Sequence, residues 1–260
     1  MPAPPPHLHV EVEGQGPWVV LAHGFGGSAR NFGSQARALR DAYRIVRYDA
    51  RGHARSAAPG DPAAYTPEMA VDDLRQVLDE VGADVAVVGG LSMGAATALR
   101  FAQAAPARVR GLVLASYPAG PAGGISRVAR PFADAIEGRG LEAAGAEFAW
   151  GPSSGLDACG AALVRQGFLE HPPQGLVHTL RGVLAAWPSL DALAPTLATV
   201  RAPALLVAGE RDAPSLGASR TLTAALPQAR LVVVPEAGHV VNVAQPAAFN
   251  AALRAFLDAL

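Results

Sequence analysis

The sequence contains no lysine, and this absence removes several kinds of chemistry. All 21 basic residues of the 260-residue chain are arginines. Without a lysine amine, the chain cannot form a Schiff base, a serine–lysine dyad or a Walker-type phosphate loop. Any nucleophile must therefore come from another residue type.

Cysteine is almost as rare. Cys159 is the only one, so the chain can form neither an internal disulfide nor a cluster of thiolate metal ligands. The N-terminal segment Met1–Pro6 lacks the basic and apolar parts of a secretory signal. Both observations favour a reducing compartment, and we expect a cytoplasmic protein.

Charge and long apolar runs are limited as well. Charged residues make up 17% of the sequence, and the formal net charge is -1, which leaves no basic surface to neutralise nucleic-acid phosphates. Hydrophobic residues make up 50% of the sequence, but no apolar run is long enough to span a bilayer. We therefore expect a soluble globular protein whose partner is a small molecule, not nucleic acid or a membrane.

Short apolar runs alternate with helical segments along most of the chain, which predicts a mostly parallel sheet covered by helices on both faces. Before these runs, His7–Glu13 alternates between apolar and polar residues, which predicts an antiparallel edge strand. The predicted parallel strands are Val19–Ala22, Arg44–Tyr48, Val85–Leu91, Gly111–Ala115, Ala204–Ala208 and Leu231–Val234.

The helices between these strands have recognisable ends. Thr66 precedes a proline and an acidic residue, which is typical of a helix start, and Gly82 marks the end of the same helix. The last helix is expected to begin near Pro246.

One region breaks the alternation, because residues 118–195 contain helical patterns but no convincing strand. We interpret this region as a helical lid inserted into an α/β core formed by residues 1–117 and 196–260. The Gly/Pro-rich Pro118–Gly124 and the later Pro195 are candidate hinges. Aromatic side chains in such a region more often pack than contact substrate. Those of interest are Trp150, Phe168, His178 and Trp187.

The segment Gly90-Leu91-Ser92-Met93-Gly94 matches the nucleophile-elbow pattern. It follows an apolar strand and precedes an alanine-rich helix, which is the context that this motif requires. The two glycines would permit the tight turn that exposes Ser92 as a nucleophile. The alternative is an ordinary glycine-rich turn with an incidental serine.

A nucleophilic serine needs a base, and the base needs an orienting acid. Asp212 follows one predicted strand and His239 follows the next, so we predict them as the acid and the base. The chain order Ser, Asp, His is that of the α/β-hydrolase triad. Glu210 is a competing acid. The histidines at positions 23, 53, 171 and 178 lack the combination of strand, glycine and chain order that His239 has.

A tetrahedral oxyanion needs two backbone N–H donors. Met93, directly after Ser92, is expected to supply one, and Phe25, in the glycine-rich loop after the strand Val19–Ala22, the other. This loop does not complete the G-x-G-x-x-G pattern of dinucleotide binding. The alternative is that the loop is only a turn followed by a helix cap at Ser28.

Taken together, these motifs resemble the α/β-hydrolase family, and most closely its small bacterial esterases and enol-lactone hydrolases. The resemblance covers about residues 8–117 and 196–258. It implies the α/β-hydrolase fold and a serine hydrolase that needs neither metal nor cofactor. The segments that carry it are His23-Gly24-Phe25-Gly26, Asp49-Ala50-Arg51-Gly52-His53-Ala54-Arg55-Ser56, Gly90-Leu91-Ser92-Met93-Gly94, Gly209-Glu210-Arg211-Asp212 and Gly238-His239.

The resemblance also separates the candidate reactions. We expect cleavage of a small carboxylic ester or lactone through an acyl-enzyme on Ser92. Ser92 disfavours the dehalogenases and epoxide hydrolases of this fold, which use aspartate, and Val240 differs from the tryptophan that follows the histidine in carbon–carbon hydrolases. A lyase-type synthase of menaquinone biosynthesis, a perhydrolase and a non-catalytic ligand receptor are also compatible with these motifs. In the family, the segment Asp49–Ser56 is a structural loop, and Ala54 replaces its usual glycine.

Overall fold

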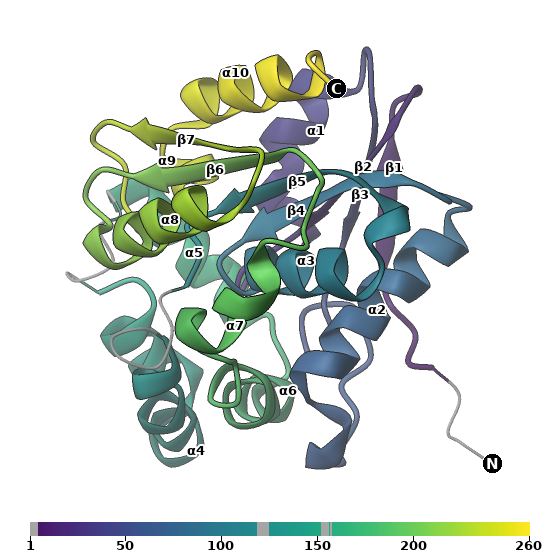
Figure 1. Cartoon of the computed structure of the whole chain (residues 1–260). Helices are drawn as coiled ribbons and strands as arrows, with labels where there is room; N and C mark the ends of the chain where they lie inside the picture. Colours follow the sequence, from purple (N-terminus) through teal and green to yellow (C-terminus); the bar gives the residue numbers. More distant parts are fainter. Residues whose placement is uncertain (1–4, 119–124, 152–155, 157) are drawn as a thin grey trace.

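Seven strands form one twisted sheet at the centre of the molecule (Figure 1). The computed structural model describes residues 5–118, 125–151, 156 and 158–260. The strands are β1 (Val10–Glu13), β2 (Trp18–Ala22), β3 (Arg44–Tyr48), β4 (Ala86–Leu91), β5 (Val109–Ala115), β6 (Ala204–Gly209) and β7 (Ala229–Val234).

The strand order in the sheet is β1-β3-β2-β4-β5-β6-β7. All neighbours are parallel except β1, which runs antiparallel to β3. The predicted parallel strands and the antiparallel edge are confirmed. However, β1 pairs with β3 and not with β2, the next strand in the chain. Because β2 is already paired on both sides, the free edge of β3 is where β1 can add.

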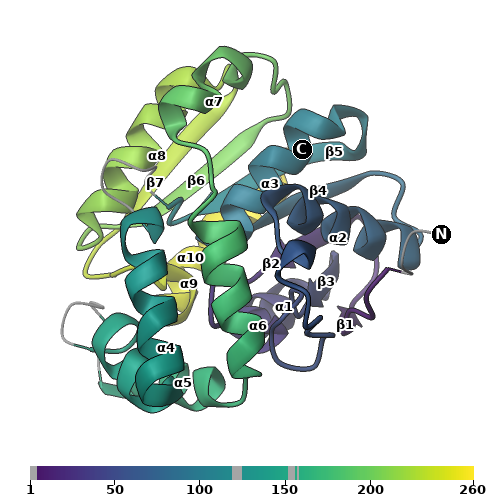
Figure 2. The ribbon, with the colours of Figure 1, turned by 90° about the horizontal axis from the view of Figure 1, so that it is seen from below.

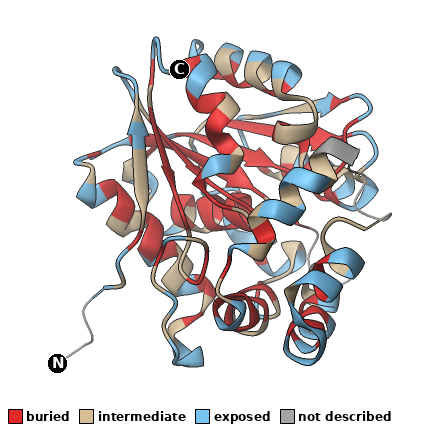
Figure 3. Cartoon of the chain, turned by 180° about the vertical axis from the view of Figure 1, so that it is seen from behind, coloured by how far each residue is buried: buried red, intermediate tan, exposed pale blue. Residues whose placement is uncertain are grey.

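Helices cover both faces of the sheet, as Figures 1 and 3 show. One face carries α1 (Gly33–Leu39), α10 (Pro246–Leu257) and the short α9 (Val241–Ala244), and the other carries α2 (Pro67–Glu80), α3 (Met93–Ala104) and α8 (Ala213–Ala225). Short 3₁₀ turns lie at Ala29–Phe32, Pro62–Ala64 and Pro106–Arg108.

Strand β2 illustrates how the two covered faces shape the sequence. Val19 and Leu21 pack into the core beneath α1 and α10, whereas Val20 and Ala22 pack into the core beneath α2 and α3. All four side chains are buried. A strand buried on both faces appears as a continuous apolar run, which is why these strands could be recognised in the sequence.

The predicted helix ends are also present. The Thr66 hydroxyl accepts a hydrogen bond from the Met69 N–H and caps α2, and Gly82 follows this helix with a φ of +71°. Helix α10 begins at Pro246. In the described part of the chain, no helix combines the length and apolar content that crossing a bilayer requires.

Between β5 and β6 the chain forms a helical insertion (Figure 2). It contains α4 (Ile125–Phe148), α5 (Ala158–Leu169), α6 (Pro173–His178), a π-helical stretch (Thr179–Leu184) and α7 (Leu190–Leu197). Helix α4 is interrupted at Gly140, where φ is +79°.

The two ends of the insertion differ. Of the predicted hinge Pro118–Gly124, all but Pro118 lies outside the described residues. Pro195 lies inside α7, and Leu193 and Leu197 of this helix belong to the core cluster shared with α8. The predicted boundary at residue 195 therefore falls within a helix that packs on the core.

Helix α3 approaches the sheet closely at its first turn. A Cβ added to Gly94 would lie 2.1 Å from the carbonyl oxygen of Ala22 at the end of β2, and one added to Gly90 would lie 2.3 Å from the same oxygen. These distances are far below a normal contact, so neither position has room for a side chain. The requirement is steric, because neither glycine has a positive φ.

Because of this close approach, a single added methyl group should destabilise the fold strongly. Gly94→Ala should lower the free energy of unfolding by about 2–3 kcal/mol, because backbone atoms must move apart to admit the new Cβ. Gly217→Ala is the matched control in α8, where an added Cβ meets nothing within 4 Å, and it should stabilise by about 0.5–1 kcal/mol. Urea unfolding followed by circular dichroism would measure both, and equal stabilities would contradict the packing argument.

Candidate active site

Ser92 lies in the sharp turn that joins β4 to α3. Its backbone has φ +52° and ψ -111°, a conformation that residues with a side chain rarely adopt and that costs about 1–3 kcal/mol. A hydrogen bond of 2.8 Å from the Ser92 N–H to the Ala115 carbonyl ties this turn to β5. The strained turn leaves the side chain partly exposed at the carboxyl end of the sheet.

Asp212 and His239 meet at the same end of the sheet, from the loops that follow β6 and β7. The His239 Nδ1–H donates to Asp212 Oδ2 at 2.7 Å. Glu210, the competing acid, is exposed and accepts a hydrogen bond from the Glu236 N–H at 3.2 Å. The structure therefore brings Asp212 to the histidine and leaves Glu210 apart from it.

Asp212 has a second partner that the sequence analysis missed. It caps α8, accepting from the Ser215 N–H at 3.4 Å, and Ser215 Oγ lies 3.3 Å from His239 Nδ1. Burial raises the pKa of Asp212, but the hydrogen bonds from His239 and Ser215 outweigh it and hold this pKa below its usual value. The carboxyl group is thus kept ionised beside the imidazole. The helix-cap pattern Asp212-Ala213-Pro214-Ser215 was the signal in the sequence.

The loop after β2 places the other predicted residues. The carbonyl oxygen of Gly24 accepts from His23 Nδ1 at 2.7 Å and from the Gly27 N–H at 3.0 Å. Because the C=O and N–H of a peptide point in opposite directions, the Phe25 N–H points away from these donors. An added Cβ on Gly24 would lie 3.4 Å from Ser92 Cβ, which brings the loop beside the serine.

Met93 provides the second predicted donor. It is the first residue of α3, where the helix supplies no acceptor for its N–H. Ser92, His239, Asp212 and the two predicted donors thus gather at one end of the sheet. Ser92 and His239 are not hydrogen-bonded to each other in this structure. Such bonds are often long in enzymes without substrate and shorten in the complex.

A cavity of about 140 Å³ opens onto Ser92 and His239. Its remaining lining is apolar, and much of it comes from the insertion. Phe132 and Phe168 lie parallel, with ring centroids 5.8 Å apart, and Phe25 meets Phe132 edge-on at 5.5 Å. The described lining residues are Gly24, Phe25, Leu91, Ser92, Phe132, Phe148, Ala149, Val164, Phe168, Leu184, His239 and Val240.

All four aromatic side chains of the insertion named above pack against other residues, and one of them, Phe168, also borders the cavity. Trp187 is buried in the core, His178 packs against Tyr65, and Trp150 packs edge-on against Phe168. Phe168 itself lines the cavity, together with Phe132 and Phe148, which the sequence analysis did not single out. Aromatic spacing alone does not distinguish a helix face that packs from one that borders a cavity.

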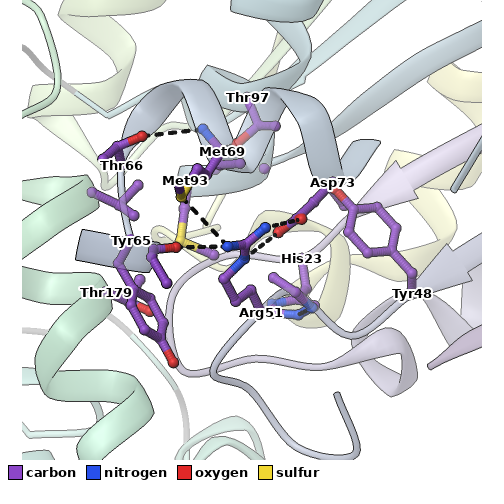
Figure 4. Close-up of a pocket in the computed structure, with 16 residues that line it drawn as sticks. His23, Tyr48, Arg51, Tyr65, Thr66, Met69, Asp73, Met93, Thr97 and Thr179 are labelled. Carbon is purple, nitrogen blue, oxygen red and sulfur yellow. Dashed lines mark hydrogen bonds and ion pairs between the residues drawn. The ribbon is translucent and has the colours of Figure 1, made fainter. Parts of the chain in front are cut away.

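A second, smaller cavity of about 30 Å³ lies behind the elbow, against Met93 and Gly94 (Figure 4). The main polar feature beside it is the buried pair of Arg51 and Asp73, joined at 2.5 and 3.0 Å. Arg51 also donates to the Ala64 carbonyl at 2.7 Å. This volume holds only a few water molecules, and the bonds of Arg51 beside it hold the loop that contains Arg51 against α2.

His23 has a structural role in this arrangement. Besides donating to Gly24, it accepts a hydrogen bond from the Ala50 N–H at 2.8 Å through Nε2. Burial lowers the pKa of His23 to about 4, so the ring is neutral near pH 7. In the part of the chain that the structure describes, no three His, Cys, Asp or Glu side chains gather as a metal site would require.

Comparisons with known proteins agree with this architecture. The sequence profile described as "Alpha/beta hydrolase family" matches residues 19–252. A provisional 2-succinyl-6-hydroxy-2,4-cyclohexadiene-1-carboxylate synthase of Bacillus subtilis (strain 168) is 31% identical over 251 residues, covering 93% of this chain and 90% of the relative.

Solved structures give the same result. A thermophilic esterase from Thermogutta terrifontis is 29% identical, with a TM-score of 0.86 over 97% of this chain and 93% of the other. The enol-lactonase from Burkholderia xenovorans LB400 is 26% identical, with a TM-score of 0.84 over 97% of each chain. The sheet order, the elbow and these matches lead to one conclusion: the chain belongs to the alpha/beta hydrolase family.

Proposed function

We propose that the protein hydrolyses a small, neutral carboxylic ester or lactone through an acyl-enzyme on Ser92. The observation that carries the proposal is the 2.7 Å hydrogen bond between His239 and Asp212, at a cavity that Ser92 and His239 line together. A serine becomes a nucleophile when a base takes its proton and a third group orients that base. In this proposal His239 is the base and Asp212 the orienting acid.

In the first half of the reaction, His239 Nε2 takes the Ser92 proton while Ser92 Oγ attacks the carbonyl carbon. The Phe25 and Met93 N–H groups stabilise the resulting oxyanion. The tetrahedral intermediate collapses and releases the alcohol, which receives the proton from His239. His239 then deprotonates a water that attacks the acyl-enzyme, and Ser92 regains its proton as the acid leaves. Apart from the substrate and this water, the steps use only groups of this chain.

The lining of the cavity supports a neutral substrate. The reaction named for the Bacillus subtilis relative gives a product with carboxylate groups, and a carboxylate in an apolar cavity needs a cation to offset its lost hydration. Among the described residues, no arginine lines the cavity, and the segments outside them contain no arginine. We therefore favour ester or lactone cleavage, as in the esterase and enol-lactonase neighbours.

The insertion fits the role of a lid over this site. Phe132, Phe148, Val164, Phe168 and Leu184 all come from it and line the cavity. Covers of this kind exclude water and shape the substrate pocket. In this proposal residues 1–117 and 196–260 provide the reacting groups, and the region 118–195 shapes the acyl pocket.

The first prediction concerns the nucleophile. A fluorophosphonate probe should label the parent protein at Ser92, and Ser92→Ala should abolish labelling and lower kcat for a p-nitrophenyl ester by about 10⁴-fold or more. Ser189→Ala, which removes the cap of α7, should still be labelled. Intact-mass spectrometry would measure the adducts, and a stoichiometric adduct on Ser92→Ala would rule out the assignment.

The second prediction concerns the acid. Asp212→Asn should lower kcat by about 10⁴-fold, because an amide can hold the imidazole in the wrong tautomer. Glu210→Gln, two positions away and exposed, should change kcat by less than about threefold. Steady-state kinetics on both variants would rank them, and the reverse ranking would mean that Glu210 is the acid.

The third prediction concerns charge on the acyl group. The kcat/KM for p-nitrophenyl hemisuccinate should be at least about tenfold lower than that for p-nitrophenyl butyrate, because the carboxylate must be desolvated without a cationic partner. The two esters have acyl chains of similar length and the same leaving group. A preference for the hemisuccinate would favour the synthase-like alternative, and no turnover of any ester or lactone would favour a receptor.

A further inference from the structure

One buried side chain of the insertion contacts two loops of the core. His171, between α5 and α6, is 4% exposed. Its Nε2–H donates to the Gly26 carbonyl at 2.8 Å, and its Nδ1 accepts from the Ala54 N–H at 2.7 Å. A carbonyl can only accept and an N–H can only donate, so these two bonds define a single neutral tautomer of the ring.

Gly26 is the residue after Phe25, and imidazoles hold both of its backbone groups. His53 Nε2 accepts from the Gly26 N–H at 3.2 Å, while His171 binds the Gly26 carbonyl. The rings of His53 and His171 lie 5.2 Å apart. Gly26 has a φ of +68°, and an added Cβ would lie 2.5 Å from the Phe168 ring. The backbone beside the predicted oxyanion donor is therefore enclosed by the insertion.

The other contact of His171 is also at an unusual backbone position. Ala54 has a φ of +43°, a region in which a side chain is strained. Its N–H donates to His171, so the insertion stabilises this strained turn in the loop Asp49–Ser56. His53 of that loop in turn binds Gly26.

We propose that His171 is a positioning residue, through which the insertion holds the loop of Phe25 in the geometry that binds the oxyanion. The inference rests on the proposed function, because it assigns His171 a part in the oxyanion site of the same reaction. His171 is buried behind the loop and touches no residue of the proposed triad. Its contribution passes through Gly26 to the neighbouring Phe25 N–H.

The surroundings of His171 favour its neutral form. Burial lowers the pKa of His171 and of His53, and for His171 the hydrogen bond to the Gly26 carbonyl and the charges of Asp49 and Glu170 only partly oppose this. Protonation would place an N–H of the ring against the Ala54 N–H and break that bond. The titratable and charged groups that face His171 are His53, His23, Asp49, Glu170 and Arg30.

The test uses two substitutions that separate hydrogen bonding from packing. His171→Phe keeps a ring of similar size but removes both bonds, whereas His171→Gln keeps one donor and one acceptor. Glu170→Gln is the matched control, because it breaks the exposed Arg30–Glu170 ion pair between the insertion and the core at 2.6 Å without touching Gly26. All variants are made in the full chain and checked by urea unfolding.

The expected result is a loss of transition-state binding with little change in substrate binding. His171→Phe should lower kcat by about 10- to 100-fold, because a misplaced oxyanion donor costs this much, and should leave KM within about twofold. The Ki of a trifluoromethyl ketone, which forms a tetrahedral oxyanion adduct, should rise in parallel. His171→Gln should recover most of the loss, and Glu170→Gln should match the parent.

Acid adds a second readout on the same variants. The unfolded chain binds a proton at a histidine below about pH 6.5, while buried His171, with its lowered pKa, stays neutral until a lower pH. The contribution of His171 to stability is therefore complete above about pH 6.5 and declines as the pH falls below that value. The stability advantage of the parent over His171→Gln should shrink between pH 8 and pH 5.

The outcomes distinguish this inference from the proposed function. If the parent is labelled at Ser92 but folded His171→Phe retains the parent kcat and Ki, the inference is wrong and the proposed function stands. If His171→Phe does not fold, the test rests on His171→Gln. A folded His171→Gln variant whose kcat is about 10- to 100-fold below that of the parent would overturn the hydrogen-bond argument. If Ser92 is neither labelled nor needed for turnover, the proposed function fails and this inference fails with it.

Discussion

The contact on which the site depends is a backbone approach, between the first turn of α3 and the carbonyl of Ala22 at the end of β2. Gly90 and Gly94 leave no room for a Cβ next to that carbonyl. This approach fixes Ser92 in its strained turn on one side. On the other side it fixes the start of the loop that contains Phe25, because His23 follows Ala22 directly. The positions of the nucleophile and of the predicted oxyanion donor thus depend on one steric constraint.

The topology of the sheet brings Asp212 and His239 to the site. Parallel strands place their carboxyl ends at one edge of a sheet, where ligands bind in open α/β folds. Asp212 follows β6 and His239 follows β7, and these strands are adjacent in the sheet. Two loops that are distant in sequence can therefore form a 2.7 Å hydrogen bond. The cap that Asp212 provides for α8 orients the carboxyl group further.

Local patterns in the sequence predicted the strands, the cap at Thr66, the helix start at Pro246 and the residues that gather at the site. Each of these depends on neighbours within a few positions: a run of apolar residues, a glycine before and after a serine, an acid after a strand. The pairing of β1 with β3 was not predicted, because it depends on which sheet edge remains free. Phe132 and Phe148 were missed for a related reason, since their helix shows its apolar residues but not what they face.

His171 was the least predictable residue, because both of its partners are distant in sequence: Gly26 and Ala54 are 145 and 117 positions away. A lone histidine in a helical region gives no local sign of such contacts. Ala54 did give a local sign, because it stands where the resemblance to the family predicts a glycine, and its φ is positive. A side chain in that conformation requires support from outside its own loop.

This support changes how the insertion should be understood. A cover that only shapes the pocket would affect which ester reacts and leave the chemistry of Ser92 unchanged. Here the same segment supplies Phe168 to the cavity wall and, three residues later, His171 to the backbone beside Phe25. A movement of α5 that widens the acyl pocket would also pull on Gly26. In the proposed mechanism, a shift of this one short stretch of chain would therefore alter selectivity and oxyanion binding together.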